Sequence, residues 1–174
     1  KLAHHIILNA REKPEGGPAW TAEHEDLWYD LWESDPQLIE TPRTIPQGDV
    51  ETVYGSYWEE ITGDPGWAGS VAYACVARPR DCVYIVYEPG TNILTLVSEI
   101  FANIPVARRW QVTFNTYFHS LPPRMTCNLR CCTPDSSALK GKRGKANIQM
   151  VDLTAKLGAP KENEYVRAAR GETA

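Results

Sequence analysis

The stretch from residue 82 to residue 118 constrains the fold more than any other part of the chain. Residues 82–87 form an unbroken run of β-favouring residues, which is typical of a strand covered on both faces in a parallel sheet. Apolar residues then recur at helical spacing over 92–104, and Pro105 ends that pattern. Residues 110–118 alternate between apolar and polar side chains, which is the period of a strand. We therefore predict an α/β fold with a mixed sheet, built around a βαβ unit of strand 82–87, helix 92–104 and strand 110–118.

The length of 174 residues fits one domain. We assign residues 1–154 to a single α/β domain and residues 155–174 to a polar tail. The chain begins at Lys1 without a methionine or a signal peptide, so we expect a fragment of a longer protein. Its apolar runs fall far short of the roughly 18 residues that a membrane span needs. A cytoplasmic location without a membrane span is therefore expected.

Other segments carry shorter signals. Asp64 followed by Pro65 predicts a helix start, because the Asp64 carboxylate can accept from free backbone N–H groups while Pro65 has no N–H to satisfy. The remaining predicted elements are a strand at 2–8, an amphipathic helix at 21–32, an irregular loop at 36–50, and weaker strands at 129–132 and 148–153.

The five cysteines are an odd number, and three of them lie within six residues. Cys127, Cys131 and Cys132 are close enough in sequence to suggest a zinc site, but no C-x-x-C pair exists, and adjacent residues of a strand point to opposite faces. We therefore expect free structural thiols in a reducing compartment and no bound metal. A zinc-stapled binding module remains an alternative.

Charge is unevenly distributed along the chain. Residues 12–64 contain 14 acidic and 2 basic side chains, whereas residues 65–174 contain 14 basic and 8 acidic ones. The acidic part disfavours nucleic acid, because phosphate contacts need lysine and arginine. The basic run 140–145 lacks the interleaved aromatic residues that stack on bases, so we interpret it as a solvated loop. Nucleic acid is therefore an unlikely partner.

One loop is a candidate for binding a small ligand. In parallel sheets, ligands bind beyond the carboxyl ends of the strands, and residues 88–92 follow the predicted strand 82–87 directly. Gly90, Thr91 and Asn92 are the residues to test there. An ordinary turn with Thr91 or Asn92 as the helix N-cap is the simpler interpretation, since a single glycine is not a phosphate-binding motif.

Histidines are the candidate proton carriers, because only their side chains titrate near neutral pH in the unperturbed state. We single out His5 and His119 as possible partners of the 88–92 loop. No serine lies in a G-x-S-x-G turn and no H-E-x-x-H helix occurs, so we assign no catalytic residue and no cofactor. Each histidine could equally be a structural one.

Six tryptophans are many for this length. Trp28 and Trp32 share one face of the predicted acidic helix and are candidates for a protein interface, because tryptophan combines a large apolar surface with an N–H donor. Packing of both rings onto the domain's own core is the alternative.

Several groups of residues resemble the middle region of bacterial GTPase-associated proteins, which are long adaptor-like proteins, common in planctomycetes, of predicted NTP-driven conflict or signalling systems. The groups are residues 2–8, 16–20, 62–69 and 109–118, followed by Leu121, Pro122 and Cys127. The resemblance implies a non-enzymatic adaptor that works beside a GTPase and effector modules, and it offers no catalytic residue. The alternative function is a small-molecule or nucleotide-binding enzyme domain that uses the 88–92 loop and a histidine.

Overall fold

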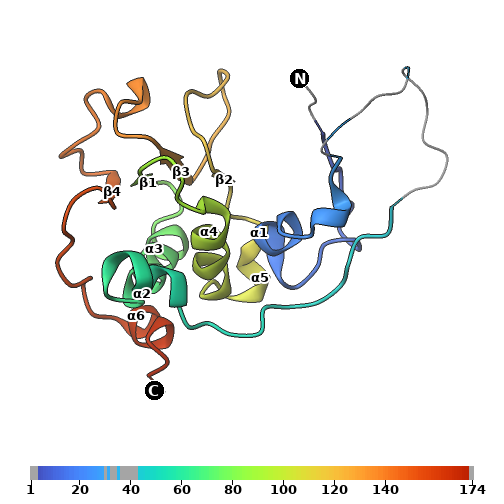
Figure 1. The fold of residues 1–174 in the computed structure, drawn as a ribbon, viewed down its shortest axis with the longest axis horizontal. Coiled ribbons are helices and arrows are strands. Elements are labelled where there is room, and N and C mark those ends of the chain that lie inside the picture. The colour runs from blue at the N-terminus through green and yellow to red at the C-terminus, as the bar shows by residue number, and fades with distance from the viewer. Residues whose placement is uncertain (1–3, 30, 32–34, 36–42, 173–174) are drawn as a thin grey trace.

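A computed structural model describes residues 4–29, 31, 35 and 43–172. Its centre is a four-stranded sheet in which every strand is parallel to its neighbours, in the order β2-β3-β1-β4 (Figure 1). The strands are β1 (Cys82–Val86), β2 (Phe114–Asn115), β3 (Leu129–Cys132) and β4 (Ile148–Asp152). The α/β class is thus confirmed, whereas the expectation of a mixed sheet was wrong.

The predicted βαβ unit is realised in part. Strand β1 and helix α4 (Ile93–Ala102) lie where the sequence pattern placed them. The second strand is much shorter than predicted, because α5 (Val106–Arg109) runs up to Trp110, whose backbone is still helical (φ −74°, ψ 0°). Strand β2 also pairs with β3 rather than with β1, so the connection through α4 passes over one strand position.

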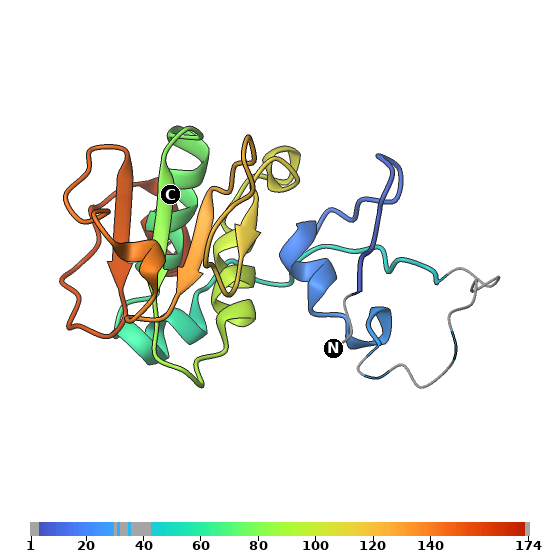
Figure 2. The same ribbon diagram turned by 90° about the horizontal axis from the view of Figure 1, so that it is seen from above.

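Helices gather on one face of the sheet (Figures 1 and 2). Helices α3 (Gly66–Ala77) and α4 pack there with α2 (Ser56–Thr62), and the buried core between them and the strands includes Val83, Ile85, Cys131 and Val151. A smaller cluster covers the other face and includes Tyr84, Phe118, Cys132 and Ala138. Neighbouring residues such as Cys131 and Cys132 therefore serve opposite faces, as strand alternation requires.

The start of α3 follows the predicted chemistry. The Asp64 carboxylate accepts a hydrogen bond from the backbone N–H of Gly66 at 2.9 Å, and Pro65 precedes the first helical residue. Asp64 also binds the guanidinium of Arg170 through two contacts of 2.8 and 2.6 Å. Pro65 is the N-cap position, and Asp64 just before it both accepts from the first N–H of α3 and links this helix to the C-terminal segment.

The C-terminal segment packs against α3 through α6 (Glu164–Ala169). Asn163 caps α6 by accepting from the backbone N–H groups of Tyr165 and Val166. A Cβ atom on Gly69 would lie 2.0 Å from the carbonyl oxygen of Tyr165, so the two backbones approach as closely as only glycine allows. We propose that this segment belongs to the domain rather than to a separate tail.

Within residues 4–50, which we call the N-terminal arm, the described residues 4–29, 31, 35 and 43–50 extend to one side of the sheet (Figure 2). The helix predicted at 21–32 differs from the structure: α1 spans Gly17–Ala22, and a short 3₁₀ helix, η1, spans Glu25–Leu27. The two are separated by His24, whose extended backbone (φ −77°, ψ 96°) ends the helical path. Residues 4–8, predicted as a strand, pair with no other strand of the described residues.

Two neighbouring residues, Arg109 and Trp110, link the arm to the sheet and its helices, which we call the body. The guanidinium of Arg109, which is 4% exposed, donates to the carbonyl oxygens of Phe101 and Ile104 at 3.0 and 2.9 Å. It also donates to the carbonyl oxygen of Glu15 at 2.6 Å and forms an ion pair with Asp49. The indole N–H of Trp110 donates to the carbonyl oxygen of Pro14 at 2.7 Å.

The helices of the described residues are short, and the longest of those named above, α3, has 12 residues. Within this part of the chain we find no helix with the length and apolar character needed to span a bilayer.

Candidate ligand and interaction sites

The 88–92 loop has the geometry of a strand-to-helix turn. Asn92 is the N-cap of α4, because its side-chain oxygen accepts from the backbone N–H of Thr95 at 3.3 Å. The Thr91 hydroxyl donates to the carbonyl oxygen of Glu88 at 2.8 Å, and Gly90 takes the left-handed conformation (φ 100°) that a tight turn needs. Gly90, Thr91 and Asn92 thus each have a local structural role, and ligand binding here stays a prediction.

His119 lies in a cavity of about 270 Å³ that follows the carboxyl ends of β2 and β3. Its Nδ1 is 3.5 Å from the hydroxyl of Ser137, and both side chains are exposed. Asp135 lines the same cavity, but its carboxylate accepts from the Thr133 hydroxyl at 2.6 Å, which lowers the pKa of Asp135. No residue of the 88–92 loop lines this cavity. The structure therefore does not bring His119 and the loop into one cavity.

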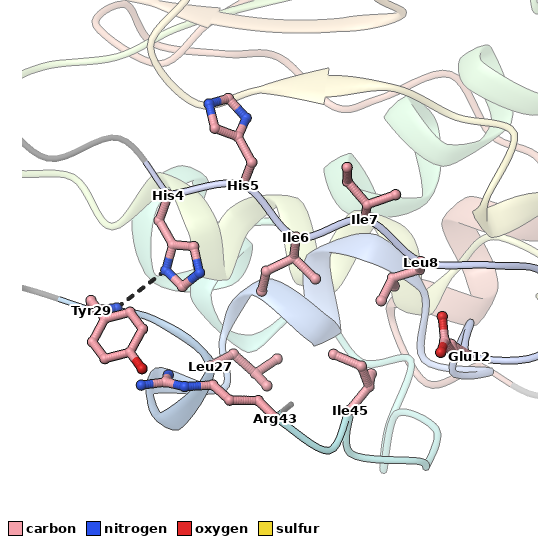
Figure 3. Close-up of a pocket in the computed structure, with 10 residues that line it drawn as sticks. All are labelled: His4, His5, Ile6, Ile7, Leu8, Glu12, Leu27, Tyr29, Arg43 and Ile45. Atoms are coloured by element: carbon pink, nitrogen blue, oxygen red, sulfur yellow. Dashed lines mark hydrogen bonds between the residues drawn. The ribbon is translucent and has the colours of Figure 1, made fainter. Parts of the chain in front are cut away.

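His5 lies in the N-terminal arm, in a second cavity of about 320 Å³ (Figure 3). Figure 3 shows His4, Ile6 and Leu8 on the side of the extended segment that faces Arg43, whereas His5 points the other way. His4 accepts a hydrogen bond from the backbone N–H of Tyr29 at 3.3 Å. The lining residues are His4, His5, Ile6, Ile7, Leu8, Glu12, Leu27, Tyr29, Arg43 and Ile45, so the 88–92 loop is absent here as well.

The arm holds itself together around Tyr29. The guanidinium carbon of Arg43 lies 3.9 Å from the centre of the Tyr29 ring, and Arg43 also donates to the carbonyl oxygens of Asp26 and Trp28. Trp28 is half-buried, its indole N–H donates to the carbonyl oxygen of Ala22 at 3.0 Å, and its ring meets the ring of His4 edge-on at 5.3 Å. Trp28 therefore packs within the arm, while Trp32 lies outside the described residues.

The three clustered cysteines do not converge. Cys131 and Cys132 are buried on opposite faces of β3, and the Cys127 thiol donates to the carbonyl oxygen of Leu129 at 3.1 Å. Burial raises the pKa of the Cys132 thiol to about 11. In the described part of the chain, no three histidine, cysteine or carboxylate side chains are grouped so that they could hold a metal ion.

The basic run 140–145 follows the turn after β3, and two of its residues, Gly141 and Gly144, take left-handed backbone conformations. Arg143 is held by an ion pair with Asp152 at 2.6 Å. Lys140 and Lys145 are exposed.

Sequence reasoning missed the contacts made by the adjacent arginines 108 and 109. Of the side chains that link the arm to the body, Arg109 makes the most hydrogen bonds. Arg108 lines a separate cavity near the amino ends of β1 and β3. The pair lies in a basic connection between two predicted elements, a setting that usually indicates solvent exposure. No local signal distinguishes a buried arginine from an exposed one there.

Comparison with known proteins gives one match. A family model described as GTPase-associated protein 1, middle domain, matches residues 56–155, whereas no curated protein and no solved structure matches the chain. The matched range begins at α2 and ends just after β4, so it includes all four strands and leaves the N-terminal arm and α6 outside. Because the match covers more than half of the sequence, the chain belongs to the family of GTPase-associated protein 1 middle domains.

Proposed function

We propose that this domain is a non-enzymatic adaptor that binds protein partners of a bacterial GTPase-associated signalling or conflict system, including a GTPase and effector modules. The family match supports the link to a GTPase system. A partner of that kind is found in the cytoplasm, so a cytoplasmic location is part of the proposal.

The observation that carries the proposal is the unpaired extended segment of the arm. Ile7 is 92% exposed. It therefore forgoes nearly all of the stabilisation that burial of an isoleucine side chain would provide. Residues 4–8 are extended, and their backbone groups make no hydrogen bond to other described residues. An extended, β-favouring segment of this kind can add itself as a strand to the sheet edge of a partner.

A second exposed apolar side chain lies farther along the same arm. Leu31 is 68% exposed. Most of the arm lies within the acidic region 12–64. Apolar anchors within an acidic field suit a partner surface that is apolar at its centre and basic at its rim. Binding through such a surface should weaken as salt is added, because salt screens the charges at the rim.

The test uses the full-length protein and the GTPase encoded beside its gene, with affinity measured by calorimetry at low salt. We expect Ile7→Asp to weaken binding by about tenfold or more, since it places a charge where an apolar anchor is buried. Met125→Asp is the matched control, because Met125 is 61% exposed in a loop of the body. Failure of the unaltered protein to bind any such GTPase would contradict the adaptor role, and equal effects of the two substitutions would contradict binding through the arm.

A further inference from the structure

Two adjacent arginines of α5 have opposite surroundings. Arg109 donates to Asp49 and to four carbonyl oxygens, those of Glu15, Phe101 and Ile104 described above and that of Ala102 at 3.3 Å. Arg108 is half-buried, and its Nε atom is fully buried without a hydrogen-bond partner. No carboxylate of the described residues forms an ion pair with Arg108.

A buried guanidinium nitrogen without a partner is costly, because a charged donor that leaves water loses its hydration without compensation. Native proteins satisfy nearly all buried donors, so an exception calls for a specific explanation, such as strain or a bound water or ion. Because the Nε atom of Arg108 is closed off from solvent, an acceptor from outside the chain reaches this guanidinium only through its terminal Nη atoms.

The cavity beside Arg108 has the size and the lining for such an acceptor. Its volume is about 220 Å³, which is below the roughly 300–1,000 Å³ of sites for drug-sized ligands. It lies near the amino ends of β1 and β3, away from the His119 cavity at the carboxyl ends of β2 and β3. The lining residues are Cys75, Val76, Pro79, Arg108, Gln111, Val112, Thr126 and Asn128.

The lining favours an anion over a cation. None of these residues is acidic, and burial raises the pKa of the Cys75 thiol to about 12, so this thiol stays uncharged at neutral pH. Asn128 is held in place by its bonds to Thr113 and to the carbonyl oxygen of Pro79, and so forms a fixed wall. Thr126 and Gln111 also line the cavity, and the Gln111 amide, which donates to the carbonyl oxygen of Ala107 at 3.1 Å, has a second N–H.

We propose that this cavity binds a small oxyanion, a phosphate or a carboxylate, with the Arg108 guanidinium as its main donor. Arginine suits this role because its planar fork matches the two oxygens of either group. The inference is independent of the N-terminal arm, so the adaptor proposal and this site can fail separately.

The test measures binding of inorganic phosphate and of acetate to the full chain, by calorimetry and by the rise in melting temperature that a bound ligand causes. We expect at least one of the two anions to bind, and its identity distinguishes a phosphate site from a carboxylate site. Arg108→Gln should weaken that binding by about tenfold or more. Arg80→Gln, which removes an exposed positive charge next to Pro79 but outside the cavity lining, should leave the affinity unchanged.

A third variant keeps the result interpretable if folding is affected. Arg108→Met replaces the unpartnered group by an apolar one of similar length, so the unliganded melting temperature should stay the same or rise, and the anion-induced rise should vanish. The proposal is overturned if neither anion binds the unaltered protein, or if Arg108→Gln and Arg80→Gln bind equally well.

Discussion

At the scale of single residues, burial separates the five thiols. Cys82 is half-buried, whereas Cys75, Cys127, Cys131 and Cys132 are buried. Burial also raises the pKa of the thiol of Cys75 to about 12, so almost none of the reactive thiolate exists there near neutral pH.

We predict that a thiol reagent added to the native protein at about pH 8 modifies Cys82 first, and modifies Cys75 and Cys131 only after unfolding. Mass spectrometry of the partly labelled protein identifies the modified position. Cys82→Ser should abolish the fast phase, and a fast phase that survives this change would show that another thiol is open to solvent.

The same scale shows where sequence reasoning about the site reaches its limit. The helix-capping role of Asn92 was one of two interpretations that the turn pattern left open, and its hydrogen bond to Thr95 is consistent with it. By contrast, nothing near Arg108 or Arg109 in the sequence reveals their different surroundings. The Arg109 guanidinium makes five hydrogen bonds, whereas the Nε of Arg108 has no hydrogen-bond partner. Those surroundings come from segments far away in the chain, such as Glu15 and Asp49.

At the scale of elements, the contact between α3 and α6 depends on the absence of a side chain. We predict that Gly69→Ala lowers the free energy of unfolding by about 1–3 kcal/mol, because the added Cβ would collide with the backbone of Tyr165. Urea unfolding followed by tryptophan fluorescence measures the change. Gly158→Ala is the matched control, since a Cβ there meets nothing within 4 Å, and an equal loss in both variants would contradict the close contact.

The ion pair between Asp64 and Arg170 should make the docking of α6 depend on pH. The hydrogen bonds from Arg170 lower the pKa of Asp64 below its usual value of about 4. The stabilisation is therefore complete above the pKa of the unfolded chain and is lost as the pH falls through the lower pKa of the folded protein.

We predict that Asp64→Asn costs roughly 1–3 kcal/mol at neutral pH, because it leaves a partly buried guanidinium with a weaker partner. The difference in unfolding free energy between the variant and the unaltered protein should shrink as the solution is acidified below about pH 4. A difference that stays constant down to the lowest pH would show that the carboxylate charge contributes nothing.

Elements with strong local patterns were predictable, and those fixed by distant contacts were not. Helix α4 has an apolar face at helical spacing and β1 is an unbroken apolar run, so both lie close to their predicted bounds. Residues 110–118 alternate as a strand would, yet only Phe114 and Asn115 pair as strand residues, with Leu129 and Arg130 of β3. Strand direction and order are decided by such pairings between distant segments, and a single sequence does not contain them.

At the scale of the whole molecule, Arg109 is the main link between the arm and the body. Burial is the largest single effect and would raise the pKa of Asp49, but the hydrogen bonds from Arg109 and from the backbone N–H of Val50, together with the charge of Arg109, outweigh it and hold that pKa below its usual value. The contacts of Arg109 thus join three parts of the chain, namely the end of α4, the turn before α1 and the segment before α2.

We predict that Arg109→Met releases the arm, because it leaves the Asp49 carboxylate and several carbonyl oxygens without their donor, at a cost of about 3 kcal/mol or more. Limited proteolysis should then cut within residues 4–50 much faster than in the unaltered protein, while the sheet stays folded by circular dichroism. Arg11→Met, at an exposed position of the arm, serves as the control. An unchanged cleavage rate in Arg109→Met would contradict the anchoring role.

The hydrogen bonds that Arg109 and Trp110 make to the arm have a consequence for related chains. Arg109 and Trp110 lie inside the range that the family shares, while the stretch they hold lies outside it. On that stretch they mostly contact main-chain oxygens, those of Glu15 and Pro14, which every amino acid supplies. The side chains at positions 14 and 15 can therefore vary without removing these two contacts, so a body of this kind can hold N-terminal arms of different sequence.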